Sequence, residues 1–158
     1  MKPNLVLTVG NGMMGDDGAG VQLAQRLREE PLEDWEVVNG GTMPENVLHL
    51  VREMSPRRVL VVDASDMDLV PGSVRLIPAA RLDDPFLLTT HTLPLTYLIE
   101  ALCEFVPQVE LLGIQPEIVA FGFPMSGAVS AAVEVVVQDL KAGRAWSLLE
   151  VNNIPETV

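Results

Sequence analysis

Three residues far apart in the chain have side chains that could together hold a divalent metal ion: Asp17, Asp63 and His91. Asp17 lies in a glycine-rich turn after the apolar segment 5–9, and Asp63 directly follows the apolar segment 59–62. His91 directly precedes a helical pattern. Two carboxylates and one imidazole suit nickel, zinc or iron and leave coordination positions open. The residue types therefore predict a metal-recognising site, provided that the three converge.

Convergence is expected because ligands of open parallel sheets bind beyond the carboxyl ends of the strands. Two carboxylates there repel each other, and one of them holds a proton unless a cation lies between them. Structural roles are the alternatives: Asp16 and Asp17 as helix caps, Asp63 as an acceptor for loop amides, and His91 bonded to a carbonyl at a helix start. His49 is expected to be structural, on an exposed or partly buried helix face.

The same turn contains Gly10, Gly12 and Gly15 in the spacing G-x-G-x-x-G of a dinucleotide site. Such a site places a pyrophosphate on the amides of the helix N-terminus, where Asp16 and Asp17 would repel it. The next strand also ends at an asparagine rather than at an acid for the ribose. The turn therefore favours a cation over an anion, and a nucleotide-dependent oxidoreductase is a weaker alternative.

Other kinds of catalytic site have little support in the sequence. It contains no His-Glu-x-x-His helix, no Gly-x-Ser-x-Gly elbow and only one cysteine. Cys103 falls on the apolar stripe of its helix and is expected in the core rather than as a nucleophile. Met13 and Met14, beside the acidic turn, are candidates for an apolar contact with a partner.

Short apolar segments alternate with helical patterns along the chain, which predicts an α/β fold. We expect a three-layer α/β/α sandwich with a mostly parallel twisted sheet of about five strands. The expected strands are 5–9, 35–38, 59–62, 74–77 and 111–114. Thr42 and Glu45 are expected to form a capping box before the second helix. Residues 1–142 are interpreted as one domain, and residues 143–158 as a loosely held C-terminal extension.

Composition narrows the possible partners and location. The formal net charge is −12, so nucleic acid and anionic membrane surfaces would be repelled. A single cysteine and the lack of an export signal predict a reducing compartment, and we expect a cytoplasmic protein. We also expect a monomer.

Several short motifs stand at the positions discussed so far. They are Val9-Gly10-Asn11, Met13-Met14-Gly15-Asp16-Asp17-Gly18, Gly40-Gly41, Val62-Asp63-Ala64, Thr90-His91 with Pro94-Leu95, and Leu112-Gly113-Ile114-Gln115-Pro116-Glu117. Together they resemble the hydrogenase maturation proteases, a family that removes a C-terminal extension from the large subunit of nickel–iron hydrogenases. The resemblance covers nearly the whole chain and looks most like the hydrogenase 3 branch of that family.

The resemblance implies that Asp17, Asp63 and His91 are both the metal ligands and the catalytic residues. It further implies that nickel is supplied by the substrate precursor and that the protein holds no resident catalytic metal. Hydrolysis then proceeds through nickel, which polarises the carbonyl or activates a water, or through a carboxylate such as Asp17 acting as base. The family commonly has an acid before the paired glycines, where this chain has Asn39.

Substrate-binding roles are expected for a second group of residues near the strand ends: Asn39, Gly40, Gly41, Gln115 and Glu117. The Gly40-Gly41 turn is expected to offer backbone amides to the substrate or to an oxyanion. The function that follows is an endopeptidase for the nickel-loaded large-subunit precursor. The alternative is a nickel-dependent chaperone or binding module that grips the same precursor without cutting it.

Overall fold

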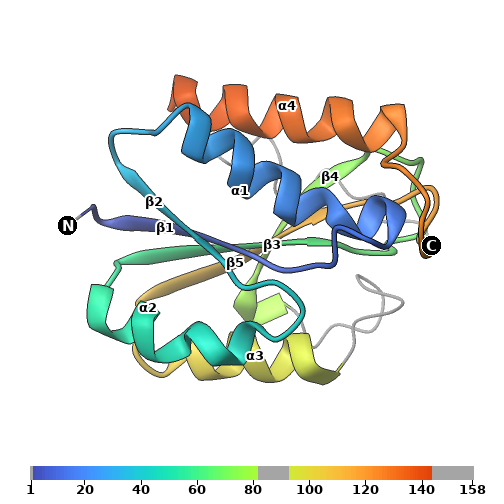
Figure 1. Ribbon diagram of the computed structural model, residues 1–158. Coiled ribbons are helices and arrows are strands. Elements are labelled where there is room, and N and C mark those ends of the chain that lie inside the picture. The colour runs from blue at the N-terminus through green and yellow to red at the C-terminus, as the bar shows by residue number, and fades with distance from the viewer. Residues whose placement is uncertain (1, 82–92, 144–158) are drawn as a thin grey trace.

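Strands and helices alternate along most of the chain, but two strands follow one another in its middle. The computed structural model describes residues 2–81 and 93–143 (Figure 1). The elements are β1 (Asn4–Thr8), the 3-10 turn η1 (Gly15–Gly18), α1 (Ala19–Glu29), β2 (Trp35–Asn39), η2 (Pro44–Val47), α2 (Leu48–Met54), β3 (Arg58–Ala64), β4 (Val74–Pro78), η3 (Ala79–Arg81), α3 (Leu93–Cys103), β5 (Gln108–Ile114) and α4 (Gly127–Ala142).

The sheet has five strands in the order β2-β1-β3-β5-β4. All neighbouring pairs are parallel except β4 and β5, which run antiparallel. β2 lies on one side of β1, and β3 lies on the other side of β1. The direction in which successive strands are added to the sheet therefore reverses between β1 and β3. In doubly wound folds this switch point is where ligands bind. Asp17 follows β1 and Asp63 lies at the end of β3, so both flank it.

Two helical layers cover the sheet, and each has its own core. Figure 1 shows α1 and α4 on one face and α2 and α3 on the other. Successive strand residues alternate between the two cores: Val6 packs with the α1 and α4 side, and Leu5 and Leu7 with the α2 and α3 side. Because both faces of the central strands are buried, these strands are apolar without alternation. The predicted three-layer sandwich is confirmed.

Two local predictions are wrong. Thr42 and Glu45 form no capping box: Met43 is the N-cap residue of the 3-10 turn η2, and no side chain caps it. Cys103, the last residue of α3, is exposed rather than in the core. Partial burial and the nearby Glu100 carboxylate raise the pKa of this thiol, which disfavours the thiolate form that a nucleophile needs.

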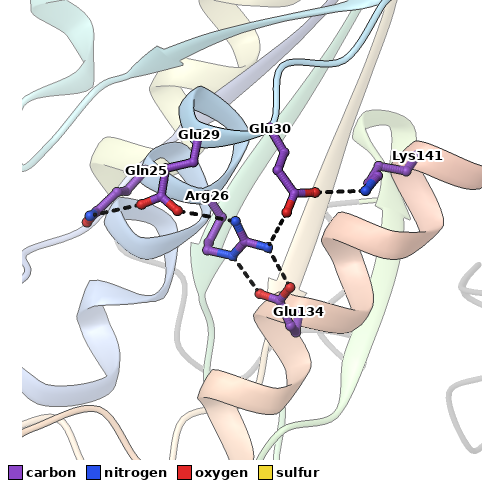
Figure 2. Close-up of polar contacts among 6 residues, drawn as sticks. All are labelled: Gln25, Arg26, Glu29, Glu30, Glu134 and Lys141. Atoms are coloured by element: carbon purple, nitrogen blue, oxygen red, sulfur yellow. Dashed lines mark hydrogen bonds and ion pairs between the residues drawn. The ribbon is translucent and has the colours of Figure 1, made fainter.

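An ion-pair network joins α1 to α4 on the outer side of their layer (Figure 2). The Arg26 guanidinium donates to both carboxylate oxygens of Glu134, at 2.8 Å from Nε and 2.7 Å from Nη2. Glu30 accepts from Arg26 at 3.3 Å and from Lys141 at 2.7 Å. The network therefore connects α1 and its C-terminal end to α4 at two points: a planar, two-pronged contact between Arg26 and Glu134, and a single bond between Lys141 and Glu30.

We expect Arg26→Met to lower the midpoint of thermal unfolding slightly, because it removes the charge at the centre of this network. The difference from the wild type should shrink in about 1 M salt, where surface charges are screened within a few ångströms. Thermal scans at low and high salt measure both effects. A deficit that is equally large in high salt would assign the role of Arg26 to packing instead of charge.

Candidate functional site

The turn after β1 places the Asp17 carboxylate at the carboxyl edge of the sheet. Gly10 has a φ of +143°, and a Cβ there would lie 2.1 Å from the carbonyl oxygen of Asp17, so only glycine fits. The turn folds back so that the Asn11 amide donates to Oδ2 of Asp17 at 3.0 Å. This bond holds the carboxylate beside its own turn. Burial raises the pKa of Asp17, and the Asn11 bond opposes that effect.

Asp63 lies on the neighbouring strand and is electrostatically coupled to Asp17. It is the residue before Ala64, the last residue of β3, and its Oδ2 accepts a long 3.5 Å bond from the Ser65 hydroxyl. Burial raises the pKa of Asp63 to about 7, and the negative charge of Asp17 adds to this shift. Near neutral pH the pair therefore holds a proton for part of the time, and it offers a favourable place for a cation.

Asp16 points away from that pair and anchors a distant loop. Its fully buried carboxylate accepts four hydrogen bonds: from the amides of Glu117 (2.8 Å), Ile118 (3.1 Å) and Ser126 (2.7 Å), and from the Ser126 hydroxyl (2.8 Å). Burial raises the pKa of Asp16, but these bonds outweigh it and the net pKa is lowered. Neither Asp16 nor Asp17 caps a helix, since Gly18 is the N-cap of α1 and no side chain caps it. The capping alternative for these two residues is wrong.

We expect Asp16→Ala to destabilise the protein by roughly 3 kcal/mol, because it leaves buried amide donors and a hydroxyl without their acceptor. Urea unfolding measures the loss. Asp34→Ala, which removes an exposed carboxylate from the opposite edge of the sheet, is the matched control. Equal stability of Asp16→Ala and the wild type would show that Asp16 does not hold the loop.

The Asn39-Gly40-Gly41 turn lies against the end of β1. Oδ1 of Asn39 accepts from the Thr8 hydroxyl at 3.3 Å and from the Gly41 amide at 2.9 Å. The Gly40 amide donates to the Thr8 carbonyl at 2.7 Å, and the Gly41 carbonyl accepts from the Gly10 amide at 3.0 Å. Both glycine amides are thus engaged within the protein in this conformation, and their use by the substrate or an oxyanion stays a prediction. Through the Gly41 carbonyl, this turn holds the turn at Gly10 in place.

Gln115 and Glu117 also act within the scaffold. The Gln115 side chain is buried; its Oε1 accepts from the Met67 amide at 2.6 Å and its Nε2 donates to Asp66 at 3.1 Å. It therefore fixes the loop that follows Asp63. The Glu117 amide binds Asp16, while its side chain is exposed. The Gln115 side chain is hydrogen-bonded to the loop in this conformation, and a substrate contact stays a prediction for both residues.

The third predicted ligand, His91, lies outside the described residues, so its approach to the two carboxylates stays a prediction. Within residues 2–81 and 93–143, no group of three or more His, Cys, Asp and Glu side chains is arranged to hold a metal ion. Asp17 and Asp63 alone make up the described part of the candidate site. His49 is exposed on α2, one of the two placements predicted for its helix face.

Sequence reasoning missed the partnership of Asp16 with Ser126. Ser126 directly precedes the apolar periodicity of α4, which is the pattern of an N-cap, and it does accept from the Val129 amide at 3.4 Å. That pattern could have identified the cap. Nothing in the spacing of residues 110 positions apart indicates that the same serine binds Asp16.

Comparisons with known proteins find relatives along most of the chain. A family model described as hydrogenase maturation protease (HycI) matches residues 21–142. The hydrogenase 3 maturation protease of Escherichia coli strain K12 is 47% identical over 138 residues, which cover 87% of this chain and 88% of that protein. The solution structure of the endopeptidase HycI from Escherichia coli has a TM-score of 0.82 at 46% identity and covers 93% of this chain and 92% of its own. The crystal structure of a [NiFe] hydrogenase maturation protease HycI from Thermococcus kodakarensis KOD1 has a TM-score of 0.77 at 26% identity, covering 89% and 92%.

Proposed function

This chain belongs to the hydrogenase maturation protease family, and from that premise we propose that it is the endopeptidase for a hydrogenase 3 type large-subunit precursor. It removes the C-terminal extension of the nickel-loaded precursor. The observation that carries the proposal is the pair of coupled carboxylates, Asp17 and Asp63, at the switch point of the sheet. The fold matches that of an endopeptidase across nearly its whole length.

Nickel enters this site as part of the substrate. The desolvated, mutually repelling carboxylates favour a divalent cation between them, and its arrival displaces the proton that the pair holds near neutral pH. With His91 they complete the coordination of the precursor-bound ion. Binding the ion then also positions the adjacent peptide bond, so that recognition and positioning are one event. A precursor without nickel lacks this anchor.

The test is time-resolved mass spectrometry of the precursor mixed with this protein, with and without inserted nickel. We expect loss of the C-terminal extension from the nickel-loaded precursor only. Equal cleavage of both forms would contradict nickel recognition while leaving the protease function intact. No cleavage of either form, in precursor shown to contain nickel, would contradict the protease function.

The alternative, a chaperone that grips the precursor without cutting it, is not favoured. Relatives that resemble the chain over most of its length are named as a maturation protease and an endopeptidase. The same experiment separates the two functions, because a chaperone binds the nickel-loaded precursor tightly and leaves its mass unchanged. A nucleotide-dependent oxidoreductase predicts micromolar binding of a dinucleotide, and calorimetry checks that directly.

The proposal includes a cytoplasmic location and a monomeric protein. Repulsion between copies that each carry a net charge of −12 opposes self-association. In the part of the chain that the structure describes, no helix combines the length and the apolar character needed to cross a bilayer. The large-subunit precursor is the partner that the family membership supplies.

A further inference from the structure

An apolar groove opens beside the turn that carries Asp17. It has a volume of about 310 Å³ and is lined by Gly12, Met13, Phe121, Gly122, Phe123 and Pro124. None of these residues is charged, although the chain has 22 acidic and 10 basic residues. Met13 is 61% exposed, Phe121 70% and Phe123 52%. Large exposed apolar side chains gathered around one groove are typical of binding surfaces.

The groove is held in shape by hydrogen bonds to the same acidic turn. The Gly122 amide donates to the Met13 carbonyl at 2.9 Å, and the Asp16 amide donates to the Ile118 carbonyl at 2.8 Å. The Asp16 carboxylate binds the loop again at both ends, at Ile118 and at Ser126. The apolar side chains therefore stand exposed on a fixed backbone, and little backbone conformational entropy is lost when a partner covers them.

The groove and the carboxylate pair share one turn of the chain. The Met13 amide donates to the Asn11 side chain at 2.9 Å, and the Asn11 amide donates to Asp17 at 3.0 Å. Met13 therefore lies in the same turn as Asp17. A polypeptide that brings a cation to Asp17 and Asp63 passes close to Met13. Its neighbouring side chains can be covered by the groove only if they are apolar, because the lining offers no charge to pair with.

We propose that the groove docks an apolar segment of the large-subunit precursor that flanks the cleaved bond. This inference rests on the proposed function and adds the surface that binds the polypeptide, separate from the carboxylates that bind the ion. A second copy of this chain is the less favoured occupant, since two chains with a charge of −12 repel each other.

Steady-state cleavage of the nickel-loaded precursor by Phe121→Ala and Phe123→Ala tests the proposal. We expect each variant to raise KM about tenfold, as loss of a large buried aromatic contact does at interfaces, with kcat within about twofold of the wild type. The matched control is Val135→Ala, which removes an equally exposed apolar side chain (52%) from the middle of α4. The control should leave both constants unchanged. Because Phe121 and Phe123 are exposed, all three variants should unfold at the wild-type urea concentration.

Several outcomes would overturn the inference. An unchanged KM in both phenylalanine variants means that the substrate does not cover the groove. A wild-type dimer that dissociates in Phe121→Ala, seen by sedimentation, means that a second copy does. Direct binding of the precursor separates this failure from failure of the proposed function. If the wild type binds the precursor without cutting it, the protease function fails, but tenfold weaker binding by Phe121→Ala still supports docking at the groove. Equal binding by the wild type and Phe121→Ala overturns the docking inference. The absence of binding by the wild type overturns it as well.

Discussion

Asp17→Asn is expected to lower the rate of precursor cleavage by at least about a thousandfold, because in the proposed function Asp17 is one of the charged groups that hold the substrate's metal ion and orient the peptide bond. The amide oxygen of asparagine can still accept the Asn11 hydrogen bond, so the turn keeps its shape. We expect His91→Ala to have an effect of similar size. Cleavage followed by mass spectrometry measures the loss, and urea unfolding verifies that both variants are folded.

The matched control for this prediction is Asp34→Asn, the same chemical change at an exposed carboxylate on the opposite edge of the sheet. It should cleave at the wild-type rate. Normal cleavage by Asp17→Asn would remove Asp17 from the site.

The two hydrolytic routes are separated by the way in which Asp17→Asn fails. A variant that binds the nickel-loaded precursor normally but does not cut it assigns Asp17 as the base that activates water. A variant whose binding falls together with its cleavage assigns Asp17 as a ligand of the ion. Binding of the precursor and single-turnover cleavage, measured on the same preparation, distinguish these results.

Asp63→Asn is expected to increase the free energy of unfolding above pH 7, by at most about 4 kcal/mol. In the folded protein the pKa of Asp63 is about 7, raised mainly by burial and further by Asp17, whereas in the unfolded chain it is near its ordinary value of 3.8. Between these values the folded state keeps a proton that the unfolded chain has lost. Wild-type stability therefore falls as the pH rises from about 4 to 7, and the full cost remains above pH 7.

Urea unfolding of the wild type and Asp63→Asn, free of metal and measured from pH 4 to pH 8, checks this expectation. The gain of the variant should be small near pH 4 and should grow until about pH 7. Asp17→Asn should reduce the cost of ionising Asp63, because it removes the charge that adds to the shift. If the stability curves of the wild type and Asp63→Asn run parallel across the whole pH range, the pKa of Asp63 is not raised in the folded protein. The variant should also lose cleavage, so that stability and function are opposed at this position.

Much of the fold follows from local patterns. The five strands appear where short apolar segments predict them, although β3 and β5 extend beyond the segments 59–62 and 111–114. The mostly parallel sheet follows from the alternation with helices, but the antiparallel direction of β4 does not. Direction and strand order depend on how the layers pack, and that information is spread over residues distant in the sequence.

The chemistry of the acidic turn shows the same division. The sequence by itself determined that carboxylates follow β1 and β3, because the residue types and the strand ends can both be read locally. Only the tertiary structure decided how the two adjacent aspartates differ: successive residues of a tight turn point in different directions, so Asp16 reaches Ser126 while the charge of Asp17 acts on Asp63. It also decided that Gln115 and the Gly40-Gly41 amides serve the scaffold, since their partners come from other strands and loops. Hydrogen bonding depends on distance in space, and a sequence records only distance along the chain.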